Sequence, residues 1–204
     1  MIRILIVCRA NVCRSPLAQI LLENALVGHG IEATVSSAGT RAHPGGTICD
    51  LVSGTVGGVP NGPARVLDHR SRALDGGLVA AADLILTAES SHRGLASAAA
   101  PRSQSRIFTL AEAAALTALV VGVPAGRHAA PEVRFAAWVR SLDDARGLLP
   151  MCSGPDRRFA VARRPESVWD IPDGHQESRW SHRRALARIA TSVTAISDSI
   201  ATSL

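Results

Sequence analysis

Apolar and polar positions along the chain alternate between two patterns. Short apolar runs predict buried strands, and apolar positions that recur every three or four residues predict helices. The predicted strands cover 2–7, 31–37, 83–87 and 106–109. The predicted helices cover 15–28, 47–57, 78–82, 89–99, 111–119, 132–149 and 177–204.

Short strands joined by helical crossovers favour an α/β fold. We expect a four-stranded parallel sheet with helices on both faces, which makes a three-layer sandwich. Right-handed crossovers bring the carboxyl ends of the strands to one edge, where open sheets of this kind bind ligands. The 204 residues fit a single domain, 1–204, with an irregular insertion around 120–165 where the pattern is weak.

The charge of the chain favours anionic substrates. Its net charge is +5, and all 22 basic residues are arginine. The arginines are spread along the chain with few aromatic residues between them, so we expect no nucleic acid partner. No apolar run is long enough for a membrane span, no signal peptide pattern is present, and the cysteines are few. We therefore expect no membrane partner and a cytoplasmic location.

The most specific chemistry lies between the first strand and the first helix, in the segment CRANVCRS at 8–15. A loop that enters a helix N-terminus offers inward-pointing backbone N–H groups and a favourable dipole for an oxyanion. Ser15 and Pro16 predict an N-cap and the first helical residue. Cys8, at the start of this loop, is placed to act as a nucleophilic thiolate.

The pattern VCRANVCRSP resembles the low-molecular-weight protein tyrosine phosphatase family. Three further segments follow in the order of that family: SSAGT at 36–40, ADLILT at 82–87 and DIPD at 170–173. The resemblance covers 1–110 and 166–204. It implies a cysteine-dependent phosphomonoester hydrolase, a protein-tyrosine phosphatase, acting on a phosphorylated protein or a small phosphomonoester. Bacterial proteins of this kind often oppose tyrosine kinases.

The resemblance also assigns roles to individual residues. Cys8 would attack phosphorus and form a cysteinyl-phosphate, Arg14 would hold the phosphoryl oxygens, and Asp173 would serve as acid and then as base. Ser15 would hydrogen-bond the thiolate, and Asn11 would stabilise an unusual backbone, since Asn tolerates positive φ. Neither a metal nor an organic cofactor is implied. The expected substrate-binding positions are Arg9, Ala10, Asn11, Val12, Cys13 and Ser15.

The sequence departs from the family at two places. Ala10 replaces a glycine, which would add about 1 kcal/mol of strain if that position needs a positive φ. Asp173-Gly174-His175 replaces Asp-Pro-Tyr, so we expect a less restrained acid loop and no tyrosine wall beside the substrate ring. Stacking would fall to His175, His43 or Trp169.

Some residues have two interpretations. Asp170 competes with Asp173 for the acid role, although the family pattern favours Asp173. The run 68–72 either contributes arginines to substrate binding or forms a solvated turn. Cys13 either fills the back of the loop or, as in some relatives, forms a protective disulfide with Cys8. We expect Cys49 and Cys152 to be structural.

Two other functions share this loop. A thioredoxin-coupled arsenate reductase would need two further cysteines close together, and residues 76–100, where they would be expected, contain none. A non-catalytic oxyanion-binding regulatory domain would keep the loop and lose turnover, which the changes at Ala10, Gly174 and His175 suggest.

Overall fold

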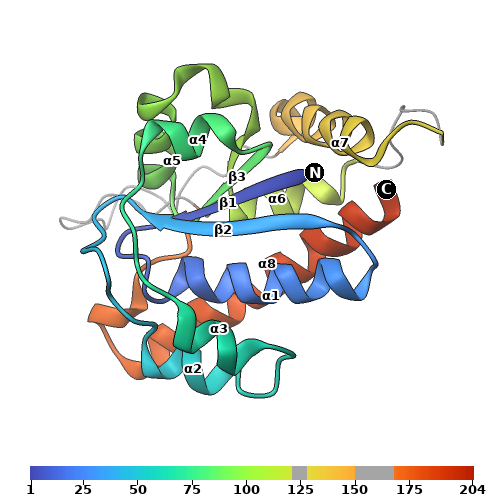
Figure 1. Cartoon of the computed structure of the whole chain (residues 1–204). Coiled ribbons are helices and arrows are strands. Elements are labelled where there is room, and N and C mark those ends of the chain that lie inside the picture. Colours follow the sequence, from blue (N-terminus) through green and yellow to red (C-terminus); the bar gives the residue numbers. More distant parts are fainter. Residues whose placement is uncertain (121–127, 150–167) are drawn as a thin grey trace.

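The four predicted strands form one parallel sheet. The structure is a computed structural model, and it describes residues 1–120, 128–149 and 168–204. The order across the sheet is β2-β1-β3-β4, so the first strand lies inside the sheet (Figure 1). The strands are β1 (Ile2–Cys8), β2 (Ala33–Gly39), β3 (Leu84–Thr87) and β4 (Ile107–Thr109).

Helices cover both faces of the sheet, which confirms the expected three-layer α/β arrangement (Figure 1). Side chains of β1 alternate between the two layers: Ile4 and Ile6 face one core, while Leu5 and Val7 face the other. The helices are α1 (Arg14–Gly28), α2 (Asp50–Thr55), α3 (Gly62–Asp68), α4 (Gly76–Ala81), α5 (Ser90–Ala99), α6 (Leu110–Thr117), α7 (Pro131–Ala145) and α8 (Arg179–Ser203). Short 3-10 turns are η1 (Pro101–Arg106), η2 (Arg146–Leu148) and η4 (Gly174–Gln176).

The larger core lies between the sheet and α1, α6 and α8. Its largest fully buried side chains include Phe108 from β4 and Phe135 and Trp138 from α7. The apolar stripe of α8, with Ile189 and Ile196, packs into the same core. The smaller core joins the sheet to α4 and α5. Within the described ranges, no helix has both the length and the apolarity to cross a bilayer.

One helix was not predicted: α3 begins after Asn61, in a stretch where the sequence pattern indicated no helix. One local expectation is wrong. Ser15 is not the N-cap of α1, because the helix starts at Arg14 and Cys13 occupies the cap position. The Ser15 hydroxyl is instead committed to the loop before the helix. Half of the expected insertion, 121–127 and 150–165 with Cys152, lies outside the described residues.

Candidate active site

The loop after β1 curls around the sulfur of Cys8. The Cys8 side chain is buried, and its Sγ lies 3.1 Å from Ser15 Oγ. The Asn11 backbone N–H donates to the same sulfur at 3.3 Å. Asn11 Nδ2 donates to Ser15 Oγ at 3.0 Å, so the Ser15 hydroxyl hydrogen can point to the sulfur or to the Ala38 carbonyl oxygen, 3.4 Å away. The Asn11 N–H and the Ser15 hydroxyl thus lie within hydrogen-bond distance of the Cys8 sulfur.

Asn11 holds the shape of this loop. Its φ is 57°, as expected, and its buried side chain donates to Ser37 Oγ at 2.8 Å and accepts from the Arg72 backbone N–H at 3.0 Å. Apart from glycines, the only other left-handed residue in the described part of the chain is Asn61. Ala10 has no positive φ, so the strain considered for it does not arise.

The segment 68–72 braces the loop from outside, a role that neither sequence interpretation included. His69 Nε2 donates to the carbonyl oxygen of Asn11 at 2.8 Å, and Arg72 Nε donates to the carbonyl oxygen of Ser37 at 2.8 Å. Burial lowers the pKa of His69, against the effect of its hydrogen bond to Asn11. A neutral imidazole with its proton on Nε2 satisfies this contact.

Gly39 at the end of β2 lets the backbone approach the loop closely. A Cβ at this position would lie 2.7 Å from the Arg9 carbonyl oxygen and 2.9 Å from the Asn11 nitrogen. Beyond it, Thr40 N–H donates to the Cys8 carbonyl and Arg41 N–H to that of Arg9. The SSAGT segment therefore forms one wall of the cradle.

Arg14 is buried under the loop among carboxylates. Its Nη2 lies 2.9 Å from Asp173 Oδ2, and its Nη1 donates to the Ile171 carbonyl at 2.9 Å and to the carboxylate of Glu89. Burial lowers the pKa of Arg14, but the nearby Cys8, Asp173 and Glu89 outweigh it and raise that pKa. Glu89 was missed by the sequence analysis. Its one signal is its place just after a strand at the ligand-binding edge.

The two candidate acids have different partners. Asp170 Oδ1 accepts from the backbone N–H and the hydroxyl of Ser90, at 2.6 and 2.7 Å, and so satisfies the first turn of α5. Asp173 instead faces Arg14 and the loop. Its other oxygen accepts from the His175 backbone N–H at 3.2 Å. The structure thus pairs Asp173, and not Asp170, with Arg14.

A pocket of about 480 Å³ opens beside the cradle. None of the three rings proposed for stacking is among the described residues that line it, and their stacking on a substrate ring stays a prediction. His175 turns instead toward His182, with the ring centroids 5.1 Å apart. The lining residues are Arg9, Thr40, Arg41, Glu89, Ser91, His92, Leu95, Asp170, Pro172, Asp173 and Glu177.

The second thiol of the loop points away from the cradle. Cys13 Sγ lies 3.5 Å from His175 Nδ1 and within 4.8 Å of Cys49 Sγ. The neighbouring Cys49 thiol, followed by burial, raises the pKa of Cys13, and the neighbouring Cys13 thiol lowers the pKa of Cys49. Cys8, Cys13 and Cys49 are all free thiols. The disulfide between Cys8 and Cys13 stays a prediction.

Sequence comparison identifies the family. Residues 3–116 match the family described as "Low molecular weight phosphotyrosine protein phosphatase". The chain belongs to this family. It is 33% identical over 119 residues to the probable low molecular weight protein-tyrosine-phosphatase EpsP of Ralstonia nicotianae, covering 53% of this chain and 70% of the relative. It is 30% identical over 115 residues to the protein-arginine-phosphatase of Bacillus subtilis, with the same coverage.

Solved structures share the fold over nearly the whole chain. The tyrosine phosphatase amsI of Erwinia amylovora superposes with a TM-score of 0.60 at 20% identity, covering 97% of this chain and 93% of its own. Wzb of Vibrio vulnificus, solved with benzylphosphonate, gives 0.60 at 19% identity and covers 97% of both chains. Membership makes the protein a cysteine-dependent phosphatase and does not favour the arsenate reductase alternative.

Proposed function

We propose that the protein hydrolyses phosphotyrosine in proteins, with Cys8 as nucleophile, Arg14 as phosphate ligand and Asp173 as acid and base. One observation supports this above the others: the 2.9 Å contact between Arg14 and Asp173, beside the buried sulfur of Cys8. The matched family region ends at residue 116, so the assignment of Asp173 rests on this contact.

Substrate binding would exchange one anion for another. Asp173 and Glu89 neutralise the buried guanidinium of Arg14 in the free enzyme. A phosphate in the loop would take the place of Asp173 on Arg14 and accept from the backbone N–H groups of 9–14. Glu89 would remain paired with Arg14 and keep the guanidinium N–H groups directed at the loop.

The first chemical step would transfer the phosphoryl group to sulfur. The Cys8 thiolate attacks phosphorus, and the P–S bond forms as the bond to the leaving oxygen breaks. Once displaced from Arg14, the Asp173 carboxylate takes a proton from solvent and then gives that proton to the leaving oxygen. Arg14 stabilises the charge on the equatorial oxygens.

The second step would return the enzyme to its starting state. Water attacks the cysteinyl-phosphate, Asp173 takes a proton of that water, and the P–S bond breaks. Asp173 releases this proton to solvent when phosphate leaves and the carboxylate pairs with Arg14 again. The electron pair returns to Cys8, and the Ser15 hydroxyl stabilises the thiolate as it leaves. The products are inorganic phosphate and the dephosphorylated side chain.

The names of the relatives point to two candidate substrates, phosphotyrosine and phosphoarginine. The Ralstonia proteins are named for tyrosine and the Bacillus protein for arginine. We favour phosphotyrosine, since the family description names it and Leu95 and Pro172 provide apolar surface beside the cradle. Four carboxylates in the same pocket make phosphoarginine the comparison substrate.

The test measures phosphate release from matched peptides that carry phosphotyrosine or phosphoarginine. We expect higher kcat/KM with phosphotyrosine and no turnover with Cys8→Ser. Preference for phosphoarginine would change the substrate and keep the mechanism. Tight phosphate binding by the wild type without turnover on either peptide would make the protein a regulatory oxyanion-binding domain.

We also propose that the 204 residues work as one domain in the cytoplasm, without a nucleic acid partner. The match of solved relatives to 97% of the chain supports the single domain. The free thiols of Cys8, Cys13 and Cys49 suit a reducing compartment. Fractionation of cells that express the full chain would test the location.

A further inference from the structure

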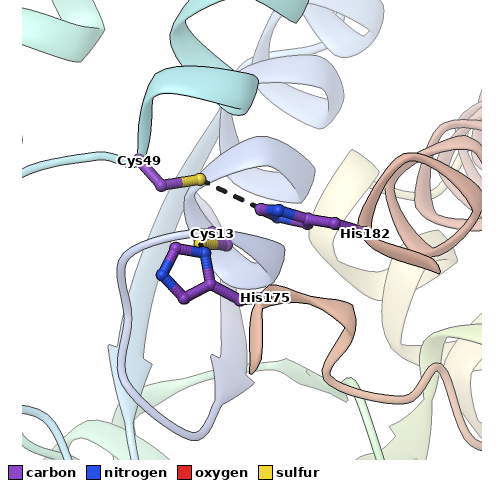
Figure 2. A group of neighbouring side chains, drawn as sticks. All are labelled: Cys13, Cys49, His175 and His182. Carbon is purple, nitrogen blue, oxygen red and sulfur yellow. Dashed lines mark hydrogen bonds between the residues drawn. The ribbon is translucent and has the colours of Figure 1, made fainter. Parts of the chain in front are cut away.

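We propose that Cys13, Cys49, His175 and His182 bind a zinc ion next to the phosphate cradle. Figure 2 shows the two sulfurs and two imidazole rings converging from four separate parts of the fold. One ligand atom from each residue can be chosen so that all four lie within 4.8 Å of one another. The proposal does not depend on the phosphatase activity.

The distances fit a tetrahedral ion after small side-chain adjustments. Bonds of about 2.0–2.3 Å to nitrogen and sulfur separate neighbouring ligand atoms by roughly 3.3–3.8 Å. Cys13 Sγ lies 3.5 Å from His175 Nδ1, and Cys49 Sγ lies 3.9 Å from His182 Nε2. Two edges of the tetrahedron are thus already near the required length.

The donor set selects the class of metal. Two thiolates and two imidazoles suit zinc, whereas magnesium and calcium prefer oxygen ligands. None of the four ligands is a carboxylate. Four protein ligands also close the coordination shell, so the ion would be structural rather than an activator of water.

The ligands come from elements that only the tertiary fold brings together. Cys13 precedes α1, Cys49 precedes α2, His175 lies in η4 and His182 lies in α8. Cys13 and His182 are buried, and Cys49 is half-buried. A pocket of about 390 Å³, whose lining includes Cys49, His175 and His182, gives an ion access from solvent to the four ligands.

Gly174 accounts for the close approach of the acid loop to α8. A Cβ at this residue would lie 2.5 Å from the His182 nitrogen and 2.6 Å from its Cα. The sequence Asp-Gly-His, where the family has Asp-Pro-Tyr, therefore both permits the contact and supplies a ligand. His175, which does not line the substrate pocket, acquires a role in this way.

A zinc ion here would connect the acid loop, which carries Asp173, to the phosphate loop, residues 8–15. His175 follows Asp173 by two residues, and Cys13 directly precedes Arg14. The ion would join these two segments through Cys13 and His175. We infer that zinc limits the movement of the acid loop in place of the missing proline.

The experiment removes the competing thiolate first. Zinc could also bind the nucleophile, so zinc content and affinity are measured on Cys8→Ser protein kept reduced. We expect one zinc per chain, and Co²⁺ in its place should give the visible bands of tetrahedral cobalt with thiolate-to-metal charge transfer. Combining Cys8→Ser with Cys49→Ala or His182→Gln should weaken zinc binding by about a hundred-fold or more. Loss of a residue that only hydrogen-bonds to a metal ligand already lowers metal affinity by about 10–100-fold, and loss of a ligand should lower it further.

His29→Gln is the matched control, since His29 lies on the surface near Asp198 and away from the four ligands. It should leave zinc affinity unchanged. Zinc that depends on Cys8 and not on Cys49, or reduced protein without stoichiometric zinc, would overturn the proposal. The cobalt spectrum is read on protein with all four ligands intact, so a variant that fails to fold does not remove the test.

Discussion

The phosphate loop and the acid loop are held in different ways, although both contribute to one site. Asn11 ties the phosphate loop to Ser15, Ser37 and the Arg72 backbone through its side chain alone. Within the described residues, the carboxylate of Asp173 has one bonded partner outside its own loop, the guanidinium of Arg14. The cradle is fixed from several elements, and the acid is held by a contact that the substrate itself replaces.

This difference follows from the chemistry required of each loop. Donors that stabilise a developing charge work best when they are oriented before the substrate arrives. An acid that becomes a base must change partners within one turnover. The fold therefore concentrates buried hydrogen bonds in the cradle and leaves the acid with an exchangeable ion pair.

Asp173→Asn should distinguish the roles of the two loops most clearly, because it removes the acid and leaves the phosphate loop unchanged. Without the acid, kcat should fall by about 10²–10⁴, because general acid–base catalysis contributes that much. Binding of vanadate should be retained, since the cradle is intact. Steady-state kinetics and vanadate inhibition measure the two effects.

Asp170→Ala is the matched control for this variant. It removes the contacts to Ser90 and should cost about 0.5–2 kcal/mol of stability, as loss of a helix cap does. A loss of kcat with Asp170→Ala as large as with Asp173→Asn would mean that the acid was assigned to the wrong carboxylate.

Arg14→Lys should lower kcat by about 10²–10³ and also weaken vanadate binding. Lysine keeps the charge but cannot offer a planar fork to two oxygens, and removal of one oriented donor from an oxyanion site has an effect of this size. Inhibition constants for vanadate, compared with those of Asp173→Asn, distinguish a cradle defect from an acid defect. Near-normal rates would contradict the proposed role of the guanidinium.

Asn11→Ala should lower the free energy of unfolding by about 2–5 kcal/mol. Roughly 1–2 kcal/mol comes from left-handed backbone strain and about 1–3 kcal/mol from buried partners left without a bond. Asn61→Ala provides the matched control, because Asn61 has the same φ of 57° and is exposed. Denaturant unfolding of both variants measures the difference, and equal losses would show that the side-chain bonds of Asn11 add nothing.

His69→Gln should change how stability depends on pH by a smaller amount. Burial lowers the pKa of His69 in the folded state, so below about pH 6.5 the unfolded chain binds a proton that the folded protein does not. Stability therefore falls as the pH falls through that window, by at most about 1.4 kcal/mol per pH unit for one group. Gln keeps a donor for Asn11 and does not titrate, so urea midpoints between pH 7 and 5 should fall less steeply. An unchanged slope would contradict this role.

The sequence was most informative for the phosphate loop, where the residues expected to take part in catalysis also determine the backbone conformation. The left-handed conformation of Asn11 and the contact of Ser15 with Cys8 agree with the resemblance. Ser15 was nevertheless misread as an N-cap, because a Ser-Pro pair signals a helix start and the thiol competes for the same hydroxyl. Strand positions were predicted to within two residues, since buried apolar runs mark them directly.

Contacts between distant segments could not be predicted. Glu89 behind Arg14 and His69 beneath Asn11 carry no local pattern that reveals their partners. Cys49 and His182 are far apart in the chain and lack the short ligand spacing that marks a zinc motif. The packing of α8 against α1, together with the hydrogen bond from Cys49 N–H to the Val12 carbonyl oxygen, brings them together.

The central claim is tested most directly by finding where the phosphoryl group is held during turnover. Trypsin cuts after Arg9 and Arg14, so Cys8 and Cys13 fall into separate peptides. Protein denatured rapidly during turnover of para-nitrophenyl phosphate should carry one phosphoryl group on the peptide that contains Cys8, as read by mass spectrometry. A phosphoryl group on the Cys13 peptide or on a histidine, or none during active turnover, would contradict the account.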